Sequence, residues 1–241
     1  MTIAFCFLTI GDLKKGDYWK SFFANVEPNK YNIYINNKTD IVDPYFQKYV
    51  IPNRYTLTKW AHISLIIATL KLFQEALKEP TNEYFVLLSD SCIPIVSFNK
   101  VEEFILKNDS NIFQNVQHTC KSKGINKRFK NADLSYITKD VISKASQWTI
   151  LKRDFVEFCV KNVDLINKFG TNFWCPDEHY FIVLCIKNGF PYKSIDYTFM
   201  DWNTSTCHPT TFSSLHQSQL VELQQRYIFL RKVAPNFCII K

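Results

Sequence analysis

Short apolar runs alternate along this chain with longer segments of helical periodicity, and this alternation restricts the fold more than any other feature. Apolar runs of strand length occur at residues 3–8, 31–35, 84–88, 148–151 and 195–199. Apolar residues at helical spacing predict helices over residues 17–25, 58–77, 100–106, 153–167, 177–187 and 213–227. Strands that alternate with helices are typical of an α/β fold with a Rossmann-like, mostly parallel central sheet flanked by helices.

The length and composition of the chain favour a single domain. It has 241 residues with no internal repeat and no evident linker, so residues 1–241 are expected to form one domain. Hydrophobic residues make up 46% of the sequence, yet none of its segments reaches the roughly 18 consecutive apolar residues of a membrane span. The N-terminal run lacks the basic start of a signal peptide. The sequence therefore predicts a soluble, cytoplasmic protein.

The charge and the cysteines restrict the possible partners only weakly. A formal net charge of +7 suits an anionic partner such as nucleic acid, an acidic membrane or the diphosphate of a nucleotide sugar. The densest basic cluster, at residues 121–130, is more typical of a solvated surface loop. None of the eight cysteines forms a C-x-x-C pair, which argues against a structural zinc site. Cys6, Cys159 and Cys185 lie in apolar runs and are predicted to be buried thiols; the even number of cysteines permits disulfides without requiring them.

Asp90 follows the most apolar of the predicted strands. Ligands of α/β sheets collect beyond the carboxyl ends of the strands, so this acid is expected to face a ligand crevice. A second acid two residues further on would make a site for Mg²⁺ or Mn²⁺ on a nucleotide diphosphate, but the sequence reads Asp90-Ser91-Cys92. The sequence therefore favours chemistry without a metal. Alternatively, Ser89 and Asp90 only cap a turn.

Asp177, Glu178 and His179 form a dense polar group in an aromatic setting, at the predicted start of a helix. A sugar hydroxyl has a very high pKa, so its attack on an anomeric carbon needs a positioned base to accept the proton. A carboxylate partly shielded by aromatic rings suits that task. In the alternative interpretation the two acids only interact with the helix dipole.

Two further groups lie near the C-terminus. Asp201 and Trp202 end a predicted strand, and the indole is either a stacking surface for a sugar or an apolar plug in the core. Arg231 and Lys232 follow a short apolar strand. The two cations either neutralise a leaving diphosphate or belong to a solvated basic turn.

The order of these groups resembles a known family. The segments FCFLT at 5–9, FVLLSDSCIPI at 85–95, SQW at 146–148, PDEHY at 176–180, FMDW at 199–202 and FLRK at 229–232 carry the resemblance, together with Trp60. They are similar to the core-2/I-branching β-1,6-N-acetylglucosaminyltransferases, glycosyltransferase family 14, and above all to its plant-type branch. The resemblance implies a GT-A-like fold, with residues 1–110 mainly in the nucleotide-sugar half and residues 111–241 mainly in the acceptor half.

The resemblance also implies roles for individual residues. Glu178 falls on the family's general base, Lys232 with Arg231 on the cation that contacts the diphosphate, and Trp202 on the ring against the acceptor sugar. On the donor side it places Thr9, Asn36 and Asp90. Near the sugars it places Gln147, Trp148, Asp177 and Asp201. At Asn36 and Asn37 the branching enzymes carry an acid, so recognition of the base is expected to differ here.

The leading hypothesis is therefore inverting transfer of a sugar, N-acetylglucosamine first, from a UDP-sugar to a hydroxyl of a glycan or glycosylated protein. No divalent metal and no other cofactor is expected. Xylosyl or glucosyl transfer stays open, because nothing in the sequence fixes the sugar. A non-catalytic module that binds carbohydrate or nucleic acid is the alternative from another class. The cations are not interleaved with aromatic residues along one stripe, so nucleic acid is not expected as a partner.

Overall fold

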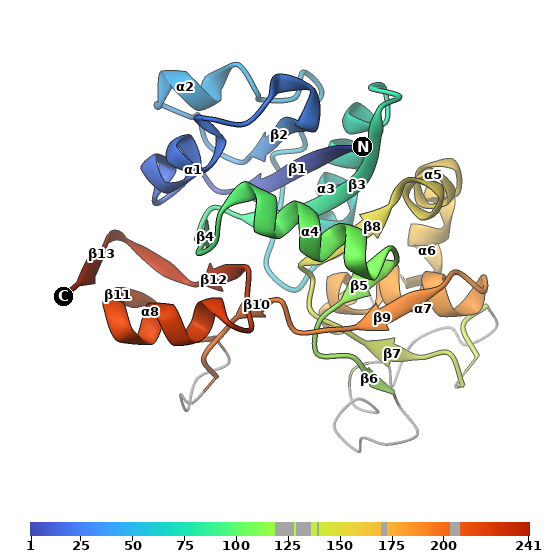
Figure 1. Ribbon diagram of the computed structural model, residues 1–241. Coiled ribbons are helices and arrows are strands. Elements are labelled where there is room, and N and C mark those ends of the chain that lie inside the picture. The colour runs from blue at the N-terminus through green and yellow to red at the C-terminus, as the bar shows by residue number, and fades with distance from the viewer. Residues whose placement is uncertain (119–127, 129–135, 139, 170–172, 203–207) are drawn as a thin grey trace.

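A mixed six-stranded sheet lies at the centre of the computed structural model, which describes residues 1–118, 128, 136–138, 140–169, 173–202 and 208–241. In spatial order its strands are β2 (Tyr31–Asn37), β1 (Thr2–Thr9), β3 (Asn82–Ser89), β8 (Thr149–Lys152), β5 (Asn111–Phe113) and β9 (Tyr192–Ser194). β1 pairs in parallel with β2 and β3, β5 pairs in parallel with β9, and only β8 runs antiparallel to its neighbours in this sheet. The predicted α/β class with a mostly parallel central sheet flanked by helices is confirmed (Figure 1).

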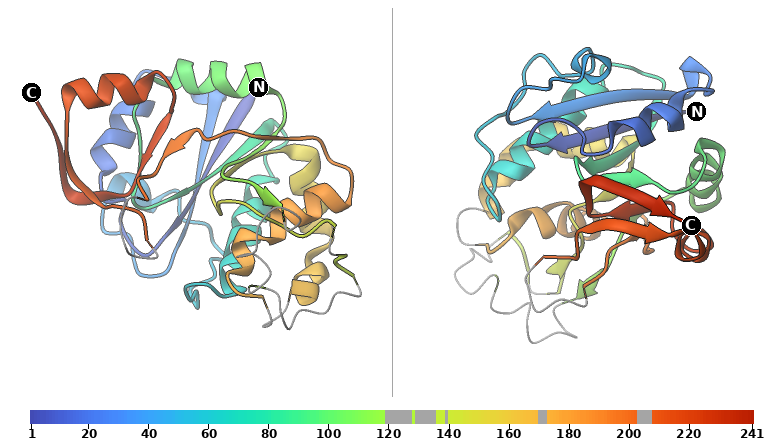
Figure 2. Two further views of the ribbon diagram at one scale, coloured as in Figure 1. Left: turned by 90° about the horizontal axis from the view of Figure 1, so that it is seen from below. Right: turned by 90° about the vertical axis from the view of Figure 1, so that its left-hand side faces the viewer.

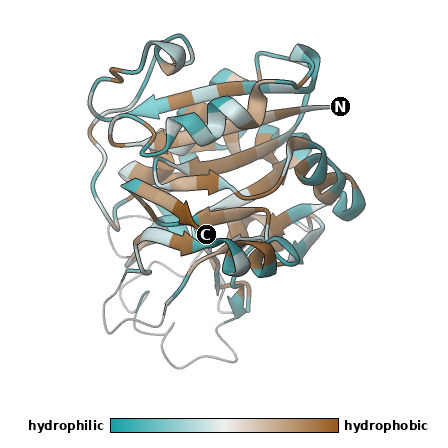
Figure 3. Cartoon of the chain, turned by 60° about the vertical axis from the view of Figure 1, so that its left-hand side comes forward, coloured by the Kyte–Doolittle hydropathy of each residue, from teal (hydrophilic) through white to brown (hydrophobic). Residues whose placement is uncertain are grey.

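Helices cover both faces of the sheet. One face packs against α3 (Ser64–Ala76), α5 (Arg153–Lys161) and α7 (Tyr180–Lys187), and the other against α1 (Gly16–Phe23) and α4 (Phe98–Asn108). Along β1, alternate residues enter the two cores: Cys6 joins the first, whereas Phe5 and Phe7 join the second. A strand that is buried on both faces is mostly apolar, which explains why β1 and β3 are easily recognised in the sequence. Figure 3 shows that apolar residues are concentrated along these central strands.

The C-terminal part of the chain adds two small sheets at one side of the central sheet (Figures 1 and 2). In the first, β12 (Phe229–Arg231) lies between β10 (Thr198–Phe199) and β4 (Cys92–Pro94). In the second, β11 (Phe212–His216) pairs with β13 (Val233–Ile240), and α8 (Gln217–Gln224) follows β11. The pairing of β12 with β4 places Arg231 opposite Cys92, directly after the end of β3. Residues far apart in the sequence are thereby brought to the same edge.

The remaining elements are short. They are η1 (Pro28–Lys30), α2 (Pro44–Gln47), β6 (Gln117–His118), β7 (Ser143–Lys144), η4 (Val163–Leu165), α6 (Ile166–Phe169) and η5 (Pro176–Glu178). Of the basic cluster predicted as a loop at residues 121–130, only Arg128 lies within the described residues. Cys6, Cys159 and Cys185 are buried free thiols, as predicted.

Several predicted elements have different boundaries. The helix predicted from residue 58 begins at Ser64, and the helix predicted over 153–167 is interrupted by η4. The strand predicted over 195–199 is wrong in its first residues, because β9 ends before residue 195 and β10 covers only Thr198–Phe199. The helix predicted over 213–227 is also wrong in its first turn, since residues 212–216 form β11. Pairing with β13, more than 15 residues away, outweighs the local helical pattern there.

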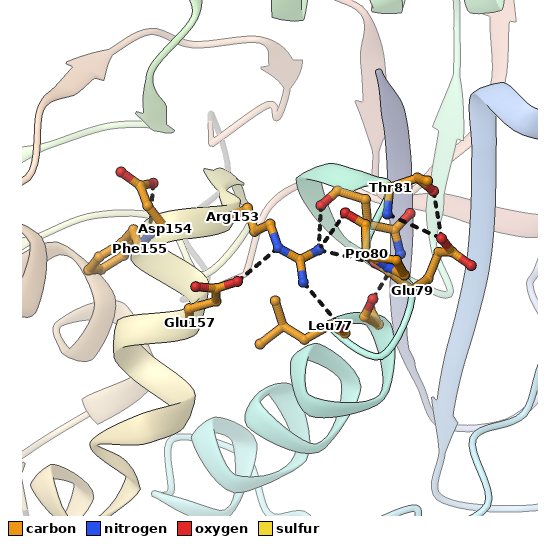
Figure 4. Close-up of polar contacts among 10 residues, drawn as sticks. Leu77, Glu79, Pro80, Thr81, Arg153, Asp154, Phe155 and Glu157 are labelled. Atoms are coloured by element: carbon orange, nitrogen blue, oxygen red, sulfur yellow. Dashed lines mark hydrogen bonds and ion pairs between the residues drawn. The ribbon is translucent and has the colours of Figure 1, made fainter.

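Arg153, the first residue of α5, ties that helix to the connection between α3 and β3 (Figure 4). Its guanidinium donates hydrogen bonds of 3.0–3.2 Å to the backbone carbonyl oxygens of Leu77, Glu79, Pro80 and Asn82. Nε donates to Oε1 of Glu157 at 2.8 Å. Five acceptors therefore surround one structural cation, well away from the candidate site described below.

In the parts of the chain that the structure describes, every helix is too short or too polar to cross a lipid bilayer.

Candidate active site

A cavity of about 650 Å³ opens where β7, η5, β12, the start of α3 and the segments after β7 and β10 approach one another. The predicted site residues that line this cavity are Gln147, Trp148, Asp177, Glu178, Trp202, Arg231 and Lys232. A somewhat larger groove, of about 720 Å³, lies between α1 and the start of α4, and it contains none of the predicted site residues. The chemistry-bearing side chains therefore converge in the smaller of the two.

Glu178 supplies the acidic wall of the cavity. Its carboxylate is 25% exposed, forms an ion pair with Arg128, and has Oε2 3.5 Å from Nζ of Lys144. Its backbone carbonyl accepts a hydrogen bond of 2.8 Å from the N–H of Ala145, which fixes η5 against the end of β7. The sequence predicted that Asp177 and Glu178 lie at the start of a helix, but they do not lie in the first turn of α7. They belong to the preceding short turn η5, and α7 begins only at Tyr180.

Asp177 and His179, on either side of Glu178, are both perturbed by burial. Burial, and then the charge of Glu178, raise the pKa of Asp177 to about 7. Its Oδ1 is buried and has no hydrogen-bond partner among the described residues. Burial lowers the pKa of His179 to about 4, and its Nδ1–H donates to the carbonyl oxygen of Ser143 at 2.8 Å. His179 is thus a neutral core residue, whereas Asp177 faces the cavity.

Arg231 supplies a partly buried cation to the lining of the same cavity. Its guanidinium carbon lies 4.7 Å from the centre of the Trp148 ring, and its Nε donates to Oγ of Ser89 at 3.3 Å. Burial lowers the pKa of Arg231, and nearby Cys92, Asp90 and Glu178 oppose that shift. No ion pair of Arg231 is found in the described parts of the chain. The alternative of a solvated basic turn is therefore wrong for Arg231.

Three tryptophans stand at the mouth of the cavity. Trp202 is 50% exposed, so the alternative of a core plug is wrong. Trp60 and Trp174 also line the cavity and are still more exposed, at 60% and 57%. Sugar rings have apolar C–H faces that stack on such indoles, so the rim is chemically suited to a carbohydrate.

The other predicted site residues do not line the cavity. Asn36 is buried and exchanges two hydrogen bonds with the backbone of Tyr55, so its amide is not available to a nucleotide base in this arrangement. Thr9 is buried at the end of β1. Asp90 follows β3 as expected, near Arg231, and Ser89 accepts a hydrogen bond from the N–H of Ser91, as the turn-capping alternative proposed.

Asp201 accepts a hydrogen bond of 2.9 Å from Oγ1 of Thr210. That bond holds the segment that carries Trp202. Asp201 itself is absent from the cavity wall, so the structure gives it a neighbouring position rather than direct access to the cavity.

Some cavity residues escaped sequence analysis. Lys144 lies in an unremarkable polar segment, and Arg128 belongs to the basic cluster that was predicted as a solvated loop. Only the fold brings these two partners of Glu178 to η5. Trp174 had a detectable signal, because an indole three residues before a pair of acids is unusual in a core segment. Within the described residues, no group of three or more His, Cys, Asp or Glu side chains is arranged to hold a metal ion.

A family model described as "Branch: Core-2/I-Branching enzyme" matches residues 3–225. The chain belongs to the core-2/I-branching enzyme family. Among curated proteins, it is 24% identical over 252 residues to glycosyltransferase BC10 of Oryza sativa subsp. japonica. The match covers 87% of this chain and 62% of that relative's length. The resemblance inferred from the motifs is thereby confirmed.

Solved structures with partial likeness include two glycosyltransferases. One, involved in glycosylation of the major capsid of PBCV-1, gives a TM-score of 0.45 at 12% identity and covers 95% of this chain and 92% of its own. Another, the apo structure of the bifunctional WbbM, gives a TM-score of 0.46 at 9% identity and covers 95% of this chain and 45% of its own. At these TM-scores neither carries an argument about this chain, and the family assignment rests on the family model.

Proposed function

We propose that this core-2/I-branching enzyme transfers a sugar from a UDP-sugar to a hydroxyl of a glycan or glycosylated protein, with inversion and without a metal. One observation carries the proposal: the Glu178 carboxylate and the cations of Arg231 and Lys232 line one cavity, although more than fifty residues separate them. A displacement at an anomeric carbon needs a base on one side and charge stabilisation on the other. N-acetylglucosamine is the sugar we propose first.

In the proposed reaction Glu178 accepts the proton of the acceptor hydroxyl. The acceptor oxygen forms a bond to the anomeric carbon while the bond from that carbon to the UDP phosphate oxygen breaks, and the electron pair leaves with UDP. Arg231 and Lys232 stabilise the negative charge of the departing diphosphate. Trp148 holds the Arg231 guanidinium against its ring, so the cation is in place before the donor arrives. A single displacement converts an α-linked donor into a β-linked product.

The surroundings of Glu178 support its role as the base. Lys144 and Arg128 keep the side chain oriented at the wall, and the buried carboxyl of Asp177 lies beside it in the chain. Asp177, with its pKa raised to about 7, carries only about half of a full negative charge at neutral pH, which reduces its repulsion of the diphosphate. Trp202 stacks on the acceptor sugar, so that the hydroxyl of that sugar faces the carboxylate of Glu178. Gln147, whose buried Nε2 has no partner among the described residues, donates a hydrogen bond to a bound sugar.

The test is the Glu178→Gln variant in a UDP-release assay with a panel of UDP-sugars and glycan acceptors. The variant is expected to bind UDP as the parent does and to lose about 10²–10⁴ in turnover, because it retains the shape but not the base. Glu103→Gln is the matched control, because Glu103 is an exposed acid on α4 away from the cavity. Near-normal turnover of Glu178→Gln would remove the base assignment. Absence of UDP release by the parent protein with every donor would contradict the transferase proposal itself.

A further inference from the structure

Positive charge exceeds negative charge among the described residues that line the candidate site. The cations of this lining are Arg128, Lys144, Arg231 and Lys232, and its acids are Asp177 and Glu178. The proposed function already uses Arg231 and Lys232 for the diphosphate. Asp177 carries only about half of a full negative charge at neutral pH, because its pKa is raised to about 7. The other two cations therefore face one full carboxylate, that of Glu178.

Arg128 and Lys144 meet at the same oxygen atom. Arg128 forms an ion pair with Oε2 of Glu178, and Nζ of Lys144 lies 3.5 Å from that atom. The side chains of the two cations are only 25% and 19% exposed, so water covers little of either charge. Both are also anchored through the backbone. Lys144 ends β7, and the carbonyl oxygen of Arg128 accepts a hydrogen bond of 2.7 Å from the N–H of Trp174.

Orientation of the Glu178 carboxylate does not require both cations. One ion pair is enough to fix a carboxylate, and a second partly buried charge adds a desolvation cost. Most of the donors of the two cations are also unused. An ammonium group has three N–H donors and a guanidinium group has five, yet within the described residues only the bond from Arg128 to Glu178 is found. Unused charged donors that line a cavity suit an anionic group of a ligand.

The proposed reaction changes this charge balance. When Glu178 accepts the proton of the acceptor hydroxyl, it loses the negative charge that faces Arg128 and Lys144. Two partly buried cations then lie close together without a full negative charge beside them, which is unfavourable. A carboxylate on the substrate, held by the same two cations, would supply that charge. Its attraction to them would grow as the proton moves, and an interaction that strengthens toward the transition state accelerates the reaction.

We propose that Arg128 and Lys144 bind a carboxylate of the acceptor, so that the preferred acceptor contains a uronic acid as the reacting sugar or as its direct neighbour. The inference rests on the proposed function, because it takes Glu178 as the base for the acceptor hydroxyl. The carboxylate belongs to the acceptor rather than the donor, because these cations contact the base. It makes and breaks no covalent bond, and it contributes binding and charge balance. A carboxylate is the anion chosen because the two cations already bind one, that of Glu178.

The test compares pairs of glycans that differ only in one group, a carboxylate or the CH₂OH that replaces it. Methyl β-glucuronide with methyl β-glucoside, and methyl α-galacturonide with methyl α-galactoside, are compared by saturation-transfer NMR. A glycan array extends the comparison to uronic acid oligosaccharides and their carboxyl-reduced counterparts. The parent protein is expected to bind the acidic member of a pair at least about tenfold more tightly, a difference of about 1.4 kcal/mol. This preference should shrink as salt is added.

Three kinds of variant locate the preference. Arg128→Gln and Lys144→Gln are each expected to lose most of it. Lys144→Arg keeps the charge and is expected to retain it. Lys107→Gln is the matched control, because it removes the same charge from an exposed lysine of α4 that does not line the cavity. Melting temperatures show that all four variants fold.

The outcomes separate this inference from the proposed function. Equal binding of acidic and neutral glycans, or a preference that survives both glutamine variants, overturns the carboxylate site. A preference that appears only among donors, as faster UDP release from UDP-glucuronate than from UDP-glucose that depends on Lys144, overturns its assignment to the acceptor. UDP release by a parent protein without any carboxylate preference refutes the inference and leaves the transferase standing. The preference without UDP release from any donor leaves the carboxylate site standing and refutes the transferase.

Discussion

Arg153 and Arg231 are two partly buried arginines in opposite situations, and replacing each by methionine should separate stability from catalysis. Arg153 donates to four backbone carbonyls and to Glu157 (Figure 4). Arg231 has one hydrogen bond to a serine hydroxyl, a weak contact with a thioether and a tryptophan face. Methionine has a similar length and carries no charge. We expect Arg153→Met to be less stable than the parent but to keep its turnover. We expect Arg231→Met to keep its stability but to lose turnover.

The expected loss of stability in Arg153→Met follows from the hydrogen-bond acceptors that Arg153 contacts. Its side chain is 27% exposed, so water replaces part of what the variant loses. A hydrogen bond to a charged group contributes about 1.5–3 kcal/mol, and breaking a partly solvated set of five is expected to cost about 3 kcal/mol in total. For a domain of this size each kcal/mol lowers the melting temperature by roughly 2–4 °C. Arg153→Met should therefore melt roughly 6–12 °C below the parent.

For Arg231→Met, the stabilising and destabilising changes in the free energy of unfolding nearly cancel in the protein without substrate. The variant loses a cation–π contact of about 1–2 kcal/mol and one hydrogen bond. It also removes a desolvated charge that lacks an ion pair in the described residues, and such a charge costs several kcal/mol after relaxation. The net change in stability is expected to stay within about 1 kcal/mol. Removing a preorganised group that stabilises the leaving diphosphate should cost about 10²–10³ in turnover.

The assay combines calorimetric melting with UDP release at saturating donor. Arg153→Met is expected to have a lower melting temperature with normal UDP release, and Arg231→Met a normal melting temperature with reduced UDP release. Arg231→Met melting as low as Arg153→Met would show that the guanidinium is a structural cation. Arg231→Met with normal turnover would show that it does not contact the leaving group. Either outcome would refute the division of roles.

Two other predictions concern pH and metal. Burial raises the pKa of Asp177 to about 7, so its carboxyl stabilises the fold when protonated, and this contribution is lost as the pH rises from about 4 through 7. Asp177→Asn should therefore gain stability relative to the parent at pH 8 compared with pH 4, by more than about 1 kcal/mol in urea denaturation; a difference independent of pH would contradict the buried carboxyl. Excess EDTA should leave UDP release unchanged, because Arg231 and Lys232 supply the charge that a metal supplies elsewhere, and a strict requirement for Mn²⁺ would contradict this.

The sequence predicts the central sheet because burial leaves a direct mark on it. β1 is buried along its whole length, and residues 84–88 of β3 are buried and apolar, so the existence of both strands follows from composition. Their ends do not, because β3 also includes the polar residues Asn82, Glu83 and Ser89. β11 carries no such mark. Its burial pattern is mostly exposed, and it is a strand only because β13 pairs with it. Local patterns report burial, whereas a pairing partner elsewhere in the chain is invisible to them.

The same distinction applies to the site. Glu178, Trp202 and Arg231 were found because they lie in short motifs with unusual chemistry. Lys144 and Arg128 were missed, because the only feature that makes them important is their distance from Glu178. The resemblance placed Asn36 on the donor side, but Asn36 lies within β2 and its side chain is bonded to the backbone of Tyr55. Position in a motif indicates a neighbourhood, and only contacts tell whether a side chain is available.

Arg231 shows how strand periodicity can turn a basic residue inward. Successive residues of a strand point to opposite faces, so Phe229 and Arg231 share one face and Leu230 takes the other. Phe229 is buried in the core that covers the central sheet, and Leu230 is buried in the separate C-terminal core. Both faces of β12 are thus occupied, and Arg231 at the end of the strand lines the cavity. An apolar strand that ends in a cation therefore does more than place charge at the surface, because the packing of Phe229 and Leu230 directs the guanidinium to the place where the proposed diphosphate leaves.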